Sequence, residues 1–154
     1  QLVAGPMNFT AGSARQDLAL PGGRKAAVFV CYEVIFTQLV NVDARLADLI
    51  VNVTNDGWFG DTPGPYQHSR QAQVRAVETG LPLLRAANTG ISGIVDGRGR
   101  VEDALAIDVR GVVDATLPQG RDAFGRIGDP NATGHAVLGL MVVLALLGGV
   151  RRRY

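Results

Sequence analysis

The chain has 154 residues and a net charge of +1, a length that suits one domain with a buried core and leaves little room for a second. Its Lys and Arg residues form no stripe through the body of the sequence, which argues against a nucleic-acid partner, because phosphate binding requires clustered cations. Cys31 is the only cysteine, so an internal disulfide is excluded. The sequence opens on Gln1 without a signal-like segment, and we expect it to be part of a longer polypeptide.

The first part of the chain predicts a loop followed by a buried strand. Residues 1–24 are rich in Gly, Pro and small polar residues and show no sustained period, and Pro21-Gly22-Gly23 predicts the turn before the strand. The apolar run over residues 26–30 is typical of a buried strand, and it stops at Cys31. Cys31 is therefore expected at the end of a strand.

The next segment completes a strand, helix, strand unit. Apolar residues recur at helical spacing after Cys31, which predicts a helix that opens at Glu33 and ends between Arg45 and Asp48. Residues 49–53 predict a second buried strand. Because parallel strands need a crossover of this kind, the unit favours a parallel sheet with Cys31 at a carboxyl end.

The middle of the chain alternates loop, helix and strand. Residues 55–65 predict a loop by composition, although they hold Trp58, the only tryptophan. Residues 67–79 predict a helix that Gly80 terminates, because Gly is favoured just after a helix end. The remaining body predicts strands over 83–87, 91–95, near 100–101 and over 111–117, a hairpin-type turn over 96–99 and a polar connector over 118–131.

The end of the chain differs in kind from the body. An apolar stretch from Ala136 to Val150 carries no charged residue and is followed at once by three arginines. Two interpretations are open, a buried core helix and a transmembrane helix over 133–150 with 151–154 as a cytoplasmic basic tail. We favour the second, because a core helix normally keeps a polar face. Residues 1–130 then form the domain on the opposite side of the membrane.

Cys31 is a candidate nucleophile. A thiol between a buried strand and a helix start gains thiolate stabilisation from the helix N-terminus, and the backbone N–H of Tyr32 can face an oxyanion. The alternative is a small buried hydrophobe, which is common for free cysteine. Glu33 either orients neighbouring groups or acts as an auxiliary acid or base, or it is a first-turn carboxylate favoured by the helix dipole.

Other polar and aromatic residues are open to structural interpretations. Trp58 and Phe59 form an aromatic pair that serves either as a packing plug, which composition favours, or as a pocket wall. We expect neither His68 nor His135 to act as the base for Cys31. No spacing of His, Cys, Asp and Glu predicts a metal site, and we expect no cofactor.

The remaining charged residues near these motifs have structural interpretations. Asp56 and Asp61 are predicted to form turns. We expect Arg75, Glu78 and Arg85 to form a buried ionic network behind the site. We therefore expect these residues to stabilise the fold and to take no direct part in catalysis.

Several spaced motifs occur in the order found in one known family. They are Val28-Phe29-Val30-Cys31-Tyr32-Glu33, Asn55-Asp56-Gly57-Trp58-Phe59-Gly60-Asp61, Gly64-Pro65, Gln67-His68, Arg75-Ala76, Glu78, Pro82-Leu83-Leu84-Arg85 and Asn88-Thr89-Gly90-Ile91-Ser92. From about residue 25 to its end, the chain resembles the C-terminal part of the apolipoprotein N-acyltransferase family. This family is the membrane-embedded branch of the nitrilase (carbon–nitrogen hydrolase) superfamily.

The resemblance implies a fold, an activity and partners. The fold is α/β, part of a nitrilase-type α-β-β-α sandwich followed by a C-terminal transmembrane helix. The activity is transfer of a fatty acyl chain from a phospholipid, through a cysteine thioester, to the N-terminal diacylglyceryl-cysteine of apolipoproteins. The location is the bacterial inner membrane, with the catalytic part on the periplasmic or outer side.

The resemblance also assigns roles to individual residues. It makes Cys31 the nucleophile, Tyr32 the residue whose N–H assists the oxyanion and Glu33 an active-site carboxylate. It makes Trp58 a pocket aromatic, and we assign Phe59 and Asn55 from the same motif to the substrate pocket.

The chain departs from the family pattern before Cys31. The family places a Glu base and a Lys upstream of the cysteine, whereas this chain has no Glu there and Lys25 falls in the wrong place. We therefore expect this chain to be inactive by itself. Two other hypotheses stay open, a soluble nitrilase-type amidase and a non-catalytic subunit with the same fold.

Overall fold

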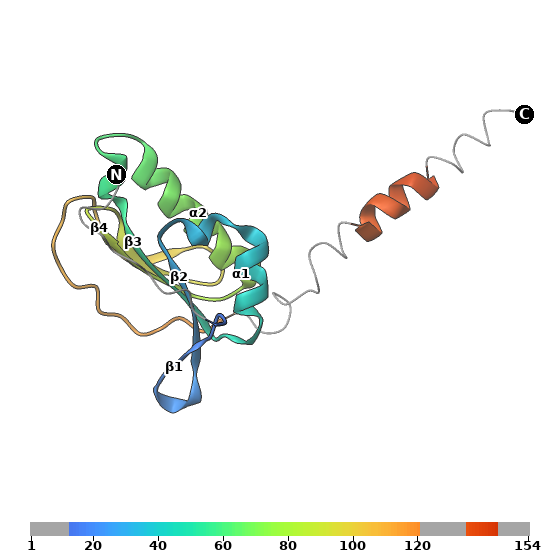
Figure 1. Cartoon of the computed structure of the whole chain (residues 1–154), viewed down its shortest axis with the longest axis horizontal. Coiled ribbons are helices and arrows are strands. Elements are labelled where there is room, and N and C mark those ends of the chain that lie inside the picture. Colours follow the sequence, from blue (N-terminus) through green and yellow to red (C-terminus); the bar gives the residue numbers. More distant parts are fainter. Residues whose placement is uncertain (1–12, 121–134, 145–154) are drawn as a thin grey trace, which may run out of the picture. The chain divides into compact units, whose positions relative to one another are not determined.

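The computed structural model describes residues 13–120 and 135–144 (Figure 1). These residues belong to two compact units of the chain, with 13–120 in the first and 135–144 in the second. The first unit contains the sheet and the site, so the elements below belong to it.

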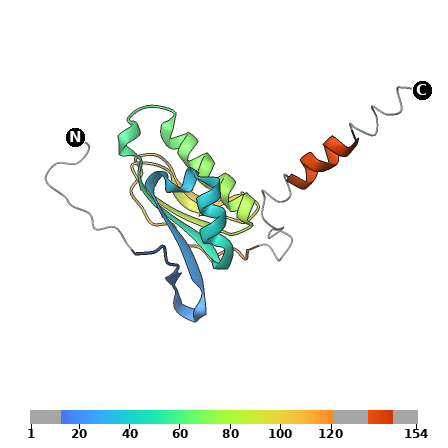
Figure 2. The same ribbon diagram turned by 45° about the vertical axis from the view of Figure 1, so that its right-hand side comes forward.

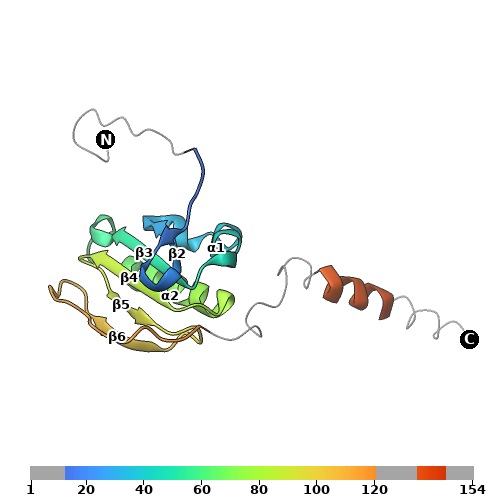
Figure 3. The same ribbon diagram turned by 90° about the horizontal axis from the view of Figure 1, so that it is seen from below.

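The first unit is built on a mixed sheet with the strand order β1-β2-β3-β4-β5-β6, and Figure 3 shows most of these strands from below. β2, β3 and β4 are parallel, while β1, β5 and β6 run antiparallel to their neighbours. The carboxyl ends of the three parallel strands therefore lie at one edge. The bounds are β1 Leu18–Ala19, β2 Lys25–Val30, β3 Leu49–Asn55, β4 Leu83–Asn88, β5 Ser92–Val95 and β6 Val101–Leu105.

Helices cover one face of this sheet (Figure 2). The α-helices are α1 (Thr37–Asp43) and α2 (Gly64–Thr79), and the short 3-10 helices are η1 (Pro21–Gly23), η2 (Cys31–Ile35), η3 (Ala44–Leu46) and η4 (Asp56–Phe59). Apolar side chains from both layers form the core, which includes Ala27, Phe29, Ile50 and Leu83 from the strands and Val34, Val40, Ala44, Ala72 and Ala76 from the helices. Burial of these side chains holds the helices on the sheet.

Most of the predicted elements are confirmed, and the parallel strand, helix, strand unit is among them. The predicted helix over 67–79 is α2, and Gly80 ends it in the left-handed conformation at φ 69°. The predicted turn over 96–99 joins β5 and β6, with the Asp96 carboxylate accepting hydrogen bonds from the N–H groups of Arg98 and Arg100. Local sequence signals were sufficient at these positions.

The continuous helix predicted from Glu33 to 45–48 is wrong. The segment divides into η2, α1 and η3, and Phe36 between the first two is extended, with φ −81° and ψ 98°. Val34, Ile35, Phe36 and Thr37 are all β-branched or aromatic, and such residues lose side-chain freedom in a helix. Of the apolar residues at helical spacing, Ile35 and Leu39 pack against the core, whereas Val42 and Leu46 are exposed, so the spacing was wrong for continuity and for the second half of the buried face.

Two further expectations are wrong at the ends of the first unit. Residues 111–117 form no strand. Most of them line a cavity on the sheet face away from the helices, while Val112 is 88% exposed. Conversely, the N-terminal segment predicted as loop contributes the short strand β1, which pairs with the first residues of β2. The turn between them is the predicted Pro21-Gly22-Gly23.

The described part of the second unit is a helix over 135–144 with exposed side chains. Within residues 13–120 and 135–144, no helix has the length and apolar content needed to cross a membrane. The predicted transmembrane helix over 133–150 extends at both ends beyond the described residues. The predicted basic tail over 151–154 lies wholly outside them. The transmembrane assignment stays a prediction.

Candidate active site

Cys31 is the first residue of η2, directly after β2, and its left-handed backbone makes the turn from strand to helix. Its φ is 52°, a region that side-chain-bearing residues rarely adopt, and its side chain is half-buried. The carboxylate of Glu33 accepts a hydrogen bond from the N–H of Val30 at 2.8 Å and so spans the turn. The structure therefore presents the one thiol on a sharp strand-to-helix turn, as the end of the apolar run predicted.

Arg15 holds Glu33 from the segment that precedes β1. Its guanidinium donates to the two carboxylate oxygens of Glu33 at 3.2 and 3.4 Å and also pairs with Asp43 at the end of α1. Partial burial acts to raise the pKa of Glu33, but the hydrogen bonds from Arg15 and from the Val30 N–H outweigh it and lower that pKa. Glu33 is therefore held as a carboxylate that braces the turn.

A row of three paired residues crosses the parallel strands below Cys31. Phe29 on β2 pairs with Asn52 on β3, which pairs with Arg85 on β4. The Asn52 side chain is fully buried, and its NH₂ group donates to the carbonyl of Phe29 at 3.0 Å and to that of Cys31 at 3.3 Å. Its carbonyl oxygen accepts from the guanidinium of Arg85.

The polar chain continues from Arg85 to His68. Arg85 forms a buried ion pair with Asp56 at 2.7 Å, and the other oxygen of Asp56 lies 2.9 Å from Nδ1 of His68. Burial lowers the pKa of Arg85, while the charge of Asp56 and that of an ionised Cys31 act in the opposite direction. A buried cation thus lies within electrostatic range of the thiol.

Three rings gather beside Cys31. The ring centroid of Tyr32 lies 5.1 Å from that of His68 and 6.2 Å from that of Phe59, and Phe59 and His68 are 5.8 Å apart. His68 is buried, and its Nε2 has no hydrogen-bond partner among the described residues. The aromatic wall of the site consists of Tyr32 and Phe59 over His68.

The other residues predicted to bind substrate lie at the same sheet edge in different settings. Asn55 ends β3, and its side-chain oxygen accepts from the N–H of Gly57 and from the amide of Asn88. These contacts shape the start of η4. Trp58 is 62% exposed, so the packing-plug interpretation is wrong for Trp58, whereas Phe59 does pack.

Sequence reasoning missed the polar network and misread two of its members. Asp56 is a buried ion-pair partner rather than a simple turn former. Arg85 pairs with Asp56, whereas Arg75 pairs separately with Glu78 at 3.1 Å, so the single predicted network is wrong. Asn52 was not singled out, although it sits inside an apolar run, and an amide that interrupts such a run is a signal that could have found it.

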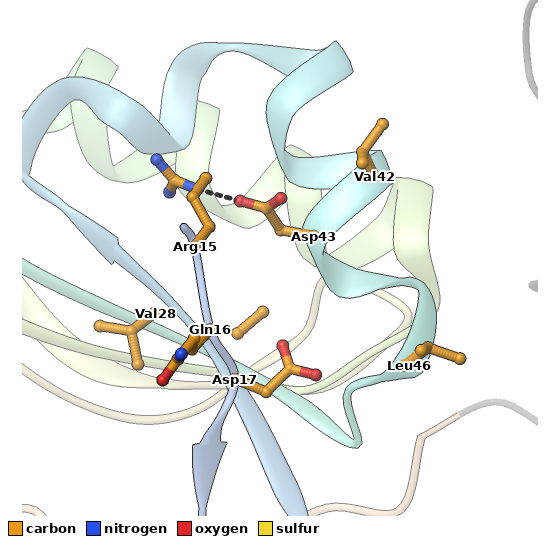
Figure 4. Close-up of a pocket in the computed structure, with 8 residues that line it drawn as sticks. Arg15, Gln16, Asp17, Val28, Val42, Asp43 and Leu46 are labelled. Atoms are coloured by element: carbon orange, nitrogen blue, oxygen red, sulfur yellow. Dashed lines mark hydrogen bonds and ion pairs between the residues drawn. The ribbon is translucent and has the colours of Figure 1, made fainter. Parts of the chain in front are cut away.

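Residues 13–120 also form cavities elsewhere, among them the following two. One of about 280 Å³ is lined by Arg15, Gln16, Asp17, Val28, Val42, Asp43 and Leu46 among others, and Figure 4 shows Arg15 turned toward Asp43. The other, of about 490 Å³, lies between the sheet face away from the helices and the segment 111–117. Cys31 lines neither, so the chemistry of the Cys31 turn identifies the candidate site. Among the described residues, no three His, Cys, Asp or Glu side chains cluster to hold a metal ion.

Comparison with known proteins places this turn in a family. The family profile for carbon-nitrogen hydrolases matches residues 6–123. The chain belongs to the carbon–nitrogen hydrolase family. This membership confirms the nitrilase-type α/β fold. The described residues supply one helix layer and one sheet of the predicted α-β-β-α sandwich.

Apolipoprotein N-acyltransferases are among the relatives that this chain matches. An apolipoprotein N-acyltransferase from Brucella melitensis aligns with the whole of this chain at 51% identity, and the alignment covers 29% of that relative's length. The resemblance stated from the motifs is thereby confirmed. The chain spans under a third of the length of such relatives.

Solved structures of carbon–nitrogen hydrolases share the fold. A carbon–nitrogen hydrolase from Helicobacter pylori matches 64% of this chain and 42% of its own, with a TM-score of 0.56 and 14% identity. A mutant amidase from Nesterenkonia sp. matches 64% of this chain and 40% of its own, with a TM-score of 0.50 and 28% identity. That amidase structure shows the acetamide moiety of fluoroacetamide added covalently at the active-site cysteine.

Proposed function

We propose that this chain is the nucleophile-bearing part of a membrane apolipoprotein N-acyltransferase. The observation that carries the proposal is the left-handed Cys31 turn in a chain that is 51% identical, over its whole length, to such an acyltransferase. The amidase with a covalent adduct at its cysteine is only 28% identical. The soluble amidase hypothesis is therefore the less favoured one.

The proposed reaction has two balanced steps at Sγ of Cys31. The family's Glu base takes the proton of the Cys31 thiol, the thiolate attacks the ester carbonyl of a phospholipid, the carbon–oxygen bond breaks, and the lysophospholipid leaves with that proton on its hydroxyl oxygen. The α-amino group of a diacylglyceryl-cysteine then attacks the thioester, the carbon–sulfur bond breaks, and the amine proton restores the thiol. The lipoprotein receives an amide-linked acyl chain.

Residues of this chain serve both steps. The Tyr32 N–H, which follows the nucleophile, donates to the oxyanion, and Glu33 braces the turn as an ionised carboxylate. Phe59 and Trp58 contact the acyl chain, and Asn55 shapes the loop that carries both rings. The family's Glu base and Lys belong to the part of the relatives that precedes the Cys31 segment.

The proposal includes a location. The Cys31 unit lies on the periplasmic side of the bacterial inner membrane, the segment over 133–150 spans it, and the arginines over 151–153 lie in the cytoplasm. The acyl donor is then a lipid of the same membrane. A dry, lipid-facing pocket protects the thioester from water.

Mass spectrometry of the protein as its source encodes it tests this function. Trypsin releases Cys31 in the peptide Ala26–Arg45. After incubation with a synthetic diacyl phospholipid in mixed micelles, we expect an acyl adduct on this peptide that hydroxylamine removes. A peptide bearing an N-terminal diacylglyceryl-cysteine should then take up the acyl chain on its amine.

Variants and the alternative hypotheses define the other outcomes. Cys31→Ala should abolish both the adduct and the acylated peptide. Release of the acyl chain to water, with none on the amine, would indicate an amidase. Absence of any adduct from the unmodified protein would indicate a non-catalytic subunit.

A further inference from the structure

The amide of Asn52 touches the backbone on both sides of the Cys31 turn. Its NH₂ group reaches the carbonyls of Phe29 and Cys31 at 3.0 and 3.3 Å, and its oxygen faces Arg85. An amide has donors on one side and an acceptor on the other, so its orientation decides whether the two carbonyls are paired or repelled. The guanidinium of Arg85 carries only donors and therefore sets that orientation.

Arg85 is itself held at each of its three nitrogens. Besides the contact with Asn52, Nη2 donates to Asp56 at 2.7 Å and Nε donates to the carbonyl of Ile91 at 3.1 Å. Asp56 is held in turn by His68 and by the hydroxyl of Thr54 at 3.1 Å. A planar guanidinium makes these directed contacts together, whereas a lysine ammonium is a single point charge on a flexible chain.

The left-handed Cys31 turn depends on such outside contacts. A non-glycine residue at φ 52° is disfavoured by its own sterics, and its environment has to maintain it. Glu33 braces the turn from the N–H of Val30, at the surface, and Asn52 braces it from the two carbonyls, in the interior. Only the second brace is fully buried.

We propose that Arg85 is a positioning residue for Cys31, acting by holding the Asn52 amide in the one orientation that pairs both carbonyls of the turn. The proposal rests on the proposed function in taking Cys31 as the nucleophile. Arg85 touches no reacting atom in this role. Substitution of Arg85 therefore lowers the rate of thioester formation and leaves the affinity for phospholipid unchanged.

A double-mutant cycle in the protein as its source encodes it tests the coupling. Arg85→Lys keeps the charge and loses the directed contacts, and Asn52→Asp keeps an acceptor for Arg85 but replaces the donors that face the turn. Each should slow formation of the Cys31 acyl adduct from phospholipid micelles about tenfold, with KM within about twofold. The double variant should be no slower than Asn52→Asp alone.

Arg100→Lys is the matched control. Arg100 also pairs with an aspartate, Asp96, at 2.8 Å, but at the exposed turn between β5 and β6. This variant should leave the rate of adduct formation within about twofold. If Arg85→Lys does not accumulate, Thr54→Val removes one hydrogen bond to Asp56 while leaving its ion pair with Arg85 in place, and it should give a smaller coupling of the same sign to Asn52→Asp.

Three outcomes would overturn the proposal. The first is that the rate effects of Arg85→Lys and Asn52→Asp multiply in the double variant. The second is that Arg85→Lys raises KM and leaves the rate of adduct formation unchanged. The third is that Arg85→Lys lowers the unfolding midpoint without changing that rate. Amide hydrogen exchange over residues 30–33 separates this proposal from the proposed function, because it needs no substrate. Faster exchange in Arg85→Lys, in a protein that forms no acyl adduct, would sustain the positioning role and refute the acyltransferase.

Discussion

Two arginines lie near the Cys31 turn, one at the surface and one in the interior. The Arg15 side chain is 42% exposed and pairs with Glu33 and Asp43, whereas that of Arg85 is 3% exposed and pairs with Asp56, which is 0% exposed. Both make ion pairs with carboxylates. They differ in what happens when a partner is lost.

The comparison teaches that burial decides the consequence of losing an ion pair. Water solvates an abandoned charge at the surface, so exposed pairs contribute little to stability. A charge left alone in the interior has no such substitute, and removal of its partner is strongly destabilising. The interior cluster therefore sets the geometry of the turn, and the surface cluster adjusts it.

Removal of Asp56 should have the largest effect. Asp56→Ala strands the buried Arg85 and His68, so we expect a loss of about 3–5 kcal/mol in the free energy of unfolding, measured by denaturant titration. The surface control Asp43→Ala should cost no more than about 1 kcal/mol. Equal losses in the two variants would contradict the contrast between interior and surface.

A methyl group at Gly90 should act on the same interior pair. A Cβ there would lie 2.2 Å from Oδ2 of Asp56, the oxygen that Arg85 contacts. Gly90→Ala should therefore cost about 1–3 kcal/mol by displacing the carboxylate, in the same titration. Gly139→Ala, at a helical position with nothing within 4 Å, is the control and should not destabilise. An unchanged midpoint for Gly90→Ala would mean that Asp56 has room to move.

Removal of Arg15 should have a smaller effect that depends on pH. Arg15→Gln should cost under about 1 kcal/mol at neutral pH, because water reaches Arg15 at 42% exposure, Glu33 at 39% and Asp43 at 19%. Glu33 has a lowered pKa, so its contribution is present above the ordinary value of 4.5 and is lost as the pH falls through the folded value.

The stability difference between the unmodified protein and Arg15→Gln should therefore shrink in acid well below that ordinary value. Denaturant titrations of both proteins, at neutral pH and in acid, measure this difference. If the stability difference between the two proteins grew in acid, Arg15 would act on stability through a group other than Glu33.

Truncation of Trp58 should change stability least. At 62% exposure, Trp58→Ala should alter the free energy of unfolding by no more than about 0.5 kcal/mol. If Trp58 contacts the acyl chain as proposed, KM for phospholipid should rise roughly fivefold, the factor for about 1 kcal/mol of lost binding. Leu46→Ala, 75% exposed in η3 just before β3, should leave KM unchanged. Equal KM values for the two variants would remove Trp58 from the proposed acyl site.

The position of the cysteine turn was predictable from the sequence. The apolar run before Cys31, the run over 49–53 and Gly80 each act within a few residues, and the structure has them as β2, β3 and the end of α2. The break at Phe36 was not predicted, because Ile35 and Leu39, at helical spacing on either side of it, both pack against the core.

The partners inside the site were decided by the tertiary structure. Phe29, Asn52 and Arg85 are far apart in the chain and become neighbours only through the register of three parallel strands. Nothing local links Asp56 to Arg85, and a composition rule assigned Asp56 to a turn.

The sequence by itself determined that one thiol ends a buried strand and which family the chain resembles, because short apolar patterns and ordered motifs are local. Which carboxylate meets which arginine, and which amide faces the Cys31 turn, followed only from folding. The physical reason is that a buried polar group must find a partner, and the sheet register decides which partners are within reach.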